Sequence, residues 1–379
     1  MRGHIRARGK QSWEVKLDVG GRDANGKRQI HYATVRGSRQ DAERRLTHLL
    51  AQHDSGTYVA PSQISLAEYL RTWLAGADHL AKKTAERYGQ LIDAQIIPFL
   101  GRVPLQQLRP SQIADWHQKM RRAGGKGGRP LSPQTVKNAH RILHCALQRA
   151  VALEIVARNV CSVVPAPKVS AKEIPILARD DIAHVLRRLQ GHRLHPVIAL
   201  AISTGLRRGE LLALQWRDID LDRASLRVER SLGETASELY VKSTKTTHGK
   251  RTIGLDEDIV EILRQHRRRQ NEERLVLGRG AARAKDLVFS DAQGAWLAPD
   301  TFSRDFWRLR KTLDLPDVPL RGFRHGHASI CLAAGVDVLT TSRRLGHSRP
   351  STTMDIYGHL FGPTDDAAVA AIRAAKSGK

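Results

Sequence analysis

The sequence is poor in cysteine, lacks any long apolar run and has too few acidic residues to balance its basic ones. Its three cysteines, Cys145, Cys161 and Cys331, are scattered, which excludes a disulfide framework or a zinc knuckle and favours a reducing cytosol. No segment approaches the run of about 18 apolar residues that a membrane-spanning helix needs. Residues 1–10 are basic without an apolar stretch, so we expect no secretory signal.

Two further absences concern cofactors. The sequence contains no glycine-rich loop of the kind that cradles nucleotide phosphates, and no acidic cluster that would bind a catalytic divalent cation. We therefore expect no cofactor. With 379 residues, of which 41% are hydrophobic and 27% charged, the chain is long and apolar enough for two or three globular domains.

Positive charge is what the sequence has in excess. Lys and Arg number 63 against 38 Asp and Glu, which gives a net charge of +25. There are 12 basic and 6 acidic residues in 1–60, 16 and 6 in 61–171, and 35 and 26 in 172–379. This spread indicates an anionic partner that the chain wraps. Nucleic acid is favoured over a solubilising surface, which would mix the two signs more evenly.

Two turn-rich stretches, residues 54–64 and 162–175, interrupt the regular hydrophobic patterns and are interpreted as joints between domains. They divide the chain into three predicted domains, residues 1–60, 61–170 and 171–379. The predicted fold class is multidomain α+β. It comprises a small N-terminal three-stranded sheet with a helix, a helical bundle, and a mixed, mainly α C-terminal domain with a small β-sheet.

Hydrophobic spacing predicts the elements of the first two domains. Residues 13–19 alternate between apolar and polar as a half-buried strand does, residues 30–36 form a return strand, and Ser38 caps a helix. A small basic sheet of this kind can enter a DNA major groove. The second domain shows helical spacing in four segments: one through Leu66–Leu74, one capped by Thr84, one from Pro110 to Arg122, and one starting at Ser132-Pro133.

The C-terminal domain contains an arginine at a glycine break between two apolar helical segments. Arg207 follows Thr204-Gly205, and Glu210 lies one helical turn further on. An unpaired buried arginine would be costly, so Glu210 is expected to hold its guanidinium. On this motif alone, a purely structural Arg–Glu pair remains an alternative to a functional site.

Three more segments carry polar groups that could take part in catalysis or binding. Residues 241–255 have four basic residues in a Thr- and Gly-rich stretch, which predicts a β-hairpin tip with lysines or simply a solvated loop. Residues 320–329 (LRGFRHGHAS) open an apolar helix. A helix over Asp337–Leu345 ends at Gly346, so that His347 directly follows its end, and Ser351 is expected to cap a last short helix that reaches Tyr357.

Taken together and in this order, Arg207, Lys245, Arg324, His347 and Tyr357 resemble the catalytic residues of the tyrosine recombinases of the phage integrase family. The matching segments, which cover about the last half of the chain, are TGLRRGELLALQWRDID, TKTTHGKRTIGL, RGFRHGHAS, LGHSRPSTT and MDIYGHL. The first half is similar to integrases that carry an arm-type DNA-binding domain followed by a helical, SAM-like core-binding domain. The resemblance therefore implies a site-specific DNA recombinase.

The resemblance implies that the Tyr357 hydroxyl attacks a DNA phosphodiester and leaves a 3′-phosphotyrosine and a free 5′-hydroxyl. The hydroxyl of a free tyrosine has a pKa of about 10, so it must be activated before it can attack at neutral pH. Arg207 and Arg324 would clamp the non-bridging oxygens, where charge gathers in the transition state, with Glu210 in support.

The remaining roles also follow from the resemblance. Lys245 would protonate the departing 5′ oxygen, with Lys242 as the nearby competitor, and His347 would hydrogen-bond the phosphate. The resemblance implies no metal. The covalent intermediate conserves the energy of the phosphodiester, so religation needs no ATP. The cofactor expectation stays at none.

One position departs from the family pattern. The box that usually reads HxxR begins here with Arg321 instead of histidine. Arginine is not deprotonated in proteins, so it cannot serve as a general base. His325 and His327 lie close in sequence. Our hypothesis is that Arg321 acts as an extra phosphate donor and that activity survives.

The implied partner is double-stranded DNA with core-type and arm-type sites, bound by a homotetramer that passes through a Holliday junction in the bacterial cytoplasm. Residues 365–375 would dock on a neighbouring protomer, and an excisionase or DNA-bending protein is compatible with this assembly. The arm domain favours the integrase of a prophage or integrative element over a chromosome-resolving recombinase or a type IB topoisomerase. A non-catalytic DNA-binding factor on the same fold is the other alternative, and only the departure from the family pattern at Arg321 favours it.

Overall fold

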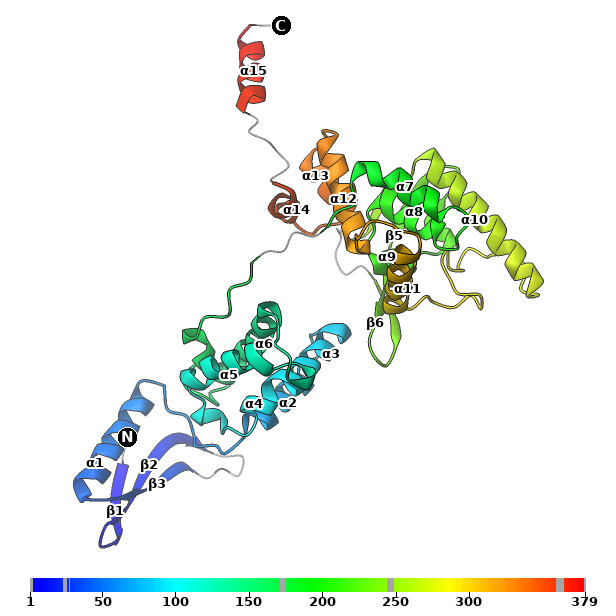
Figure 1. Ribbon diagram of the computed structural model, residues 1–379. Helices are drawn as coiled ribbons and strands as arrows, with labels where there is room; N and C mark the ends of the chain where they lie inside the picture. The colour runs from blue at the N-terminus through cyan, green and yellow to red at the C-terminus, as the bar shows by residue number, and fades with distance from the viewer. Residues whose placement is uncertain are drawn as a thin grey trace. The chain divides into compact units, whose positions relative to one another are not determined.

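The structure is a computed structural model that describes residues 3–22, 26, 28–170, 175–243, 249–358 and 365–377. The chain divides into two compact units, Met1–Ala171 and Lys172–Lys379, which are described separately (Figure 1). Among the described helices, none has both the length and the apolar character needed to cross a membrane.

A three-stranded antiparallel sheet backed by one helix opens the first unit, as the sequence predicts. The elements are β1 (Gly3–Gly9), β2 (Ser12–Arg22), β3 (Arg28–Arg36) and α1 (Arg39–Asp54), and the strands pair in chain order. The helix covers the face of the sheet on which Val15 and Leu17 are fully buried. Ser38 and Asp41 each accept a hydrogen bond from the other's backbone N–H, which satisfies two donors at the start of the helix.

A helical bundle completes the first unit. Its elements are α2 (Leu66–Ala75), α3 (Lys82–Leu91), the π-helix η1 (Ile92–Ile96), α4 (Ile97–Leu100), η2 (Leu105–Gln107), α5 (Pro110–Ala123), η3 (Lys126–Gly128), α6 (Pro133–Ala152) and η4 (Val160–Val163). Leu70, Trp116 and Leu143 lie in its common core. The predicted start of α3 is wrong: the helix begins at Lys82, and Thr84 already donates its N–H to the Ala81 carbonyl within the first turn.

The second unit is mainly helical. Its helices are α7 (Arg179–Leu189), α8 (His195–Thr204), α9 (Arg208–Leu212), η5 (Trp216–Asp218), α10 (Glu257–Val276), α11 (Pro299–Thr312), α12 (Leu320–Ala333), α13 (Val338–Leu345), α14 (Pro350–Tyr357) and α15 (Asp365–Lys376). Strands β4 (Ile219–Asp220), β5 (Ser225–Val228) and β8 (Arg251–Gly254) form one antiparallel sheet, and β6 (Arg230–Glu234) and β7 (Leu239–Ser243) form a hairpin. These elements confirm the predicted α+β class.

The buried helix α8 is the centre of this unit, and α7, α10 and α12 pack around it (Figure 1). Near α12, the chain ends α13 at Gly346, which adopts the left-handed conformation with φ of 69°, as the sequence predicts. The predicted cap of the last short helix is wrong. Arg349 is the extended residue before α14 and Pro350 occupies its first turn, so Ser351 lies inside the helix.

Candidate active site

The turn after α8 places Arg207. Gly205 ends α8 in the left-handed conformation with φ of 62°, and a Cβ atom at this position would lie 2.8 Å from the His327 ring. Only glycine fits this turn without strain. Arg207 follows as the extended residue before α9. The next arginine, Arg208, donates to the Pro299 carbonyl at 2.8 Å and belongs to the packing of α11, so the two adjacent arginines have different partners.

Glu210 holds two arginines at once. Its side chain is 3% exposed and accepts hydrogen bonds from Arg207 Nη1 at 2.8 Å and from Arg251 Nη2 at 2.9 Å. Burial by itself would raise the pKa of the Glu210 carboxyl, but the hydrogen bond and charge of Arg251 and the charge of Arg207 hold it below its usual value. The predicted Arg207–Glu210 pair is therefore present, and Arg251 is a partner that the sequence reading missed.

Replacing Glu210 with alanine should lower the free energy of unfolding by about 3–5 kcal/mol, because the buried charge of Arg251 would lose the carboxylate that neutralises it. Since the pKa of Glu210 is depressed in the folded state, this stabilisation is present above the usual carboxyl pKa and is lost as the pH falls through the folded-state value. Urea unfolding at pH 7 and pH 4 measures both effects. Glu257→Ala, at an exposed position in α10, is the control. Equal stability of Glu210→Ala and wild type at pH 7 would contradict this account.

Arg324 is a buried cation of the cluster. It projects from α12, is 8% exposed, and donates to the Gly205 carbonyl at 2.8 Å and the Leu345 carbonyl at 2.7 Å. Burial, followed by the nearby Arg207 charge, lowers its pKa to about 9, so the guanidinium stays charged at neutral pH. Arg207 Nη2 donates to the neighbouring Gly346 carbonyl at 3.0 Å. The two guanidinium groups thus meet at the end of α13.

His347 and Tyr357 complete the cluster. His347 Nδ1 lies 2.8 Å from the Thr353 hydroxyl, and burial with the charges of Arg324 and Arg207 lowers its pKa to about 4, so its ring is neutral. Tyr357 ends α14, is 3% exposed, and has its hydroxyl 2.6 Å from His325 Nδ1. Burial raises the pKa of Tyr357 to about 12 against the opposing charges of Arg324 and Arg321.

Arg321 and His325 form the edge of the same site. Arg321 Nε donates to His325 Nε2 at 3.2 Å, four residues along α12. His327 points away from the site. Its Nδ1 atom contacts the Ile202 carbonyl, and its Nε2 atom accepts a hydrogen bond from Arg344 Nε at 3.0 Å. His325 is thus a residue of the site, although the sequence indicated only that His325 and His327 both lie close to Arg321. The one feature of the sequence that could have singled out His325 is its position four residues after Arg321, which places both side chains on the same face of a helix.

A cavity of about 740 Å³ opens over this cluster. Its lining includes five of the residues just described, namely Arg207, Arg321, Arg324, His325 and His347. The structure thus brings together all the predicted site residues that it describes. Lys245 lies outside the described residues, and its competitor Lys242 is exposed on β7.

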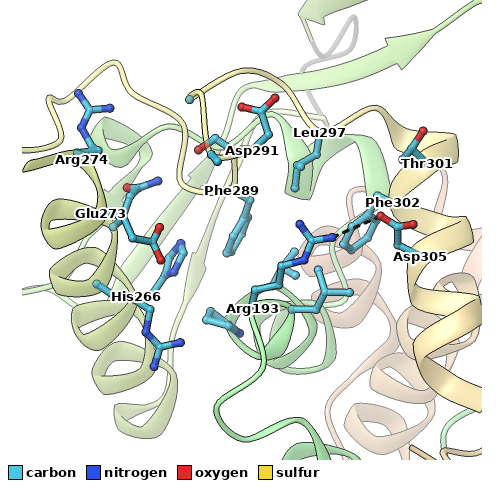
Figure 2. Close-up of a pocket in the computed structure, with 18 of the residues that line it drawn as sticks. Arg193, His266, Glu273, Arg274, Phe289, Asp291, Leu297, Thr301, Phe302 and Asp305 are labelled. Atoms are coloured by element: carbon cyan, nitrogen blue, oxygen red, sulfur yellow. Dashed lines mark ion pairs between the residues drawn. The ribbon is translucent and has the colours of Figure 1, made fainter. Parts of the chain in front are cut away.

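A second cavity, of about 400 Å³, contains none of the predicted site residues and is lined from α8, α10 and α11 (Figure 2). On one wall Arg193 lies 3.5 Å from the Asp305 carboxylate, the ion pair drawn in Figure 2. His266 contacts the Val288 carbonyl at 2.7 Å and stacks on Phe289. These groups already have partners, so they give the second cavity no evident chemistry.

The cluster places two guanidinium groups and a neutral imidazole around one open space, and the Tyr357 hydroxyl contacts His325, which lines the same space. Guanidinium groups in a buried setting bind phosphate oxygens, and a tyrosine can act as a nucleophile. Within the described residues, no three His, Cys, Asp or Glu side chains are placed to hold a metal ion. The arrangement is therefore suited to nucleophilic attack on an anionic phosphoryl group.

Comparison with known proteins gives matches over both units. The sequence model described as "Phage integrase family" matches residues 177–362, and "Phage integrase, N-terminal SAM-like domain" matches residues 65–121. A protein of Caldanaerobacter subterraneus subsp. tengcongensis named "Tyrosine recombinase XerC-like" is 29% identical over 378 residues, 93% of each chain.

Two solved structures have a similar fold. The Tn1549 transposon integrase, in complex with transposon right end DNA, covers 82% of this chain and 98% of its own, with a TM-score of 0.66 and 21% identity. The lambda integrase tetramer bound to a Holliday junction covers 93% of this chain and 95% of its own, with a TM-score of 0.58 and 20% identity.

Proposed function

The chain belongs to the phage integrase family, and on this premise we propose that it is a site-specific DNA recombinase that integrates and excises a mobile element. One observation carries the proposal: Arg207, Arg324 and His347 line a single open cavity, and the Tyr357 hydroxyl lies 2.6 Å from His325, which lines it too, although the four residues come from separate parts of the unit. Convergence of this set favours catalysis over mere binding, because binding DNA does not require a buried tyrosine beside two arginines.

The proposed reaction begins when the Tyr357 oxygen attacks a DNA phosphorus atom. The tyrosine–phosphorus bond forms while the bond from phosphorus to the 5′ oxygen breaks, which leaves a 3′-phosphotyrosine and a 5′-hydroxyl. Arg207 and Arg324 neutralise the charge that builds on the non-bridging oxygens, and their fixed positions mean that little reorganisation is needed. His347, held by Thr353, hydrogen-bonds the same phosphate.

Lys245 is proposed to protonate the departing 5′ oxygen, and Arg321 to donate to the phosphate from its Nη groups. The 5′-hydroxyl of a second strand can then attack the phosphotyrosine, which exchanges strands through a Holliday junction. Because each covalent bond is replaced by another of similar energy, no ATP is needed, and the charges of Arg207 and Arg324 do the work that a metal ion would do at the phosphate.

We propose a separate role for each of the three predicted domains. We assign residues 1–60 to arm-type sites, residues 61–170 to core-type sites, and residues 171–379 to catalysis. Opposite α1, the sheet presents exposed basic and aromatic side chains, among them Arg6, Arg36 and Tyr32. A basic sheet face of this kind can follow a DNA groove.

A tetramer on paired DNA sites is part of the proposal, and an excisionase or DNA-bending protein is compatible with it. The proposed recombination takes place in the bacterial cytoplasm, where the chromosome lies. Val369 and Ile372 are exposed three residues apart on α15, which gives this helix an apolar strip for a neighbouring protomer.

Changing Val369 and Ile372 together to aspartate should therefore prevent tetramer formation on DNA while leaving binding of a single protomer to one site in place. Native gel shifts with one and with two sites measure the difference. Arg373→Gln, on the same helix, is the control for a change without loss of apolar surface. Unchanged tetramers in the double variant would rule out this role of α15.

The recombinase proposal is tested by trapping the covalent intermediate. Purified protein is mixed with DNA flanking its gene in EDTA, denatured, and examined for protein held on DNA, with Tyr357→Phe as the control. A Tyr357-dependent adduct is expected. A non-catalytic DNA-binding factor, which only Arg321 favours, would bind DNA without any adduct.

A further inference from the structure

A chain of two hydrogen bonds reaches from Arg321 to the proposed nucleophile. Arg321 Nε lies 3.2 Å from His325 Nε2, and His325 Nδ1 lies 2.6 Å from the Tyr357 hydroxyl. Arg321 and His325 are four residues apart on α12, so both face the same side of the helix. His325 is buried, and its ring centroid lies 5.6 Å from that of Tyr357.

This chain fixes which nitrogen of His325 carries the proton. A guanidinium N–H can only donate, so His325 Nε2 must accept through its lone pair and carries no proton. Burial, followed by the charges of Arg321 and Arg324, lowers the pKa of His325, so the ring is neutral at neutral pH. A neutral imidazole carries one proton, and here it must reside on Nδ1.

We propose that His325, oriented by Arg321, donates a hydrogen bond from Nδ1 to the Tyr357 oxygen, positioning this nucleophile and stabilising its phenolate instead of removing its proton. This inference rests on the proposed recombinase function. The Tyr357 proton passes to water, and Lys245 separately supplies the proton of the 5′-hydroxyl. The arginine in the usual histidine position thus acts through the next histidine along the helix.

Other charged and titratable groups also face this pair. Arg324, also on α12, acts on both residues, and Arg207 from the start of α9 and His347 from the segment between α13 and α14 line the same cavity as His325. The two arginines are cationic and His347 is neutral near pH 7, so none of them supplies a base to Tyr357. The donor from His325 adds to the arginine charges, which oppose the effect of burial on the Tyr357 pKa.

The tautomer can be measured without any activity. In DNA-free protein labelled with ¹⁵N-histidine, and with His325→Asn to assign the signal, the ¹⁵N shifts should show His325 protonated at Nδ1. Protonation at Nε2 would overturn the proposal. Arg321→Ala should release this preference, because Nε2 then loses its donor.

The rate of adduct formation tests the consequence. His325→Ala should lower the rate at pH 7 by about 10- to 100-fold and move the midpoint of the pH–rate profile upward. His325→Asn should restore most of the rate, because its amide N–H lies near the place of Nδ1 and an amide cannot take a proton. His327→Asn, two residues along the same helix, controls for packing and should leave the midpoint in place.

The outcomes separate this inference from the recombinase proposal. If wild type forms no adduct on DNA that it binds, the recombinase proposal fails, while the tautomer measurement still stands. If His325→Ala reacts as fast as wild type, or if His325→Asn is as slow as His325→Ala at equal melting temperature, the donor role is overturned. His325→Ala should cost less in an Arg321→Ala background than in wild type, because Arg321 orients His325 in addition to contacting the phosphate, and an equal cost in both backgrounds would show that Arg321 does not act through His325.

Discussion

Replacing Arg324 with alanine is expected to lower the rate of DNA cleavage by about 10³- to 10⁵-fold, the range in which a transition-state arginine acts on a phosphoryl group. Arg324 is a buried charge of the site, and its two bonds to Gly205 and Leu345 aim it without further reorganisation. Buried charge of this kind is worth far more than charge in water. Single-turnover adduct formation on saturating DNA measures the loss.

Arg324→Lys is the informative companion variant. Lysine keeps a positive charge but cannot donate to both carbonyls and to a phosphate with one planar group, so we expect only a partial rescue. Arg310→Lys, which changes another buried arginine that lines the same cavity, controls for packing. If Arg324→Ala cleaves DNA within tenfold of wild type, the arginine clamp is not the source of catalysis.

The second large effect concerns Lys245. Lys245→Ala is expected to lower cleavage of ordinary DNA by about 10²- to 10⁴-fold, the range of general acid catalysis. A substrate with sulfur in place of the bridging 5′ oxygen should restore cleavage, because a thiol has a pKa of roughly 8.5 and leaves without a proton. Arginine-clamp variants should gain no comparable rescue from this substrate.

Lys242→Ala is the matched control, because Lys242 is exposed on β7 three residues before Lys245. We expect it to cleave ordinary DNA nearly as fast as wild type. Sulfur rescue of Lys242→Ala, and no rescue of Lys245→Ala, would transfer the proton-donor role to Lys242. Rescue of neither variant would show that a lysine does not protonate the leaving group.

Local sequence rules predicted the elements well where backbone chemistry decides the outcome. Pro110 and Pro133 begin α5 and α6, and Gly346 ends α13 in the conformation that glycine tolerates. The same rules failed at Thr84 and Ser351. There, a hydroxyl-bearing residue lies one or two positions inside a helix whose start is set by the extended Ala81 or by Pro350. Cap preference alone does not locate a helix start.

The resemblance to the integrases identified the residues of the site, but a contact between two of them could be predicted only where both are close in sequence. Arg207 and Glu210 are three residues apart, so their pairing follows from helix geometry. Arg251 lies 41 residues from Glu210, and its role depends on how β8 packs beside α13. His325 and His327 are alike in sequence. The 100° turn per helical residue separates them, so one reaches Tyr357 and the other Ile202.

The most direct test of this account is to identify the atoms joined in the trapped adduct. Protein denatured after reaction with DNA in EDTA is digested with protease and nuclease, and mass spectrometry locates the peptide that carries the nucleotide. The account predicts a nucleotide joined through its 3′ phosphate to Tyr357, with a free 5′-hydroxyl on the other side of the break. A nucleotide on another residue such as Tyr240, a link through a 5′ phosphate, or cleavage that leaves no protein on the DNA would contradict it.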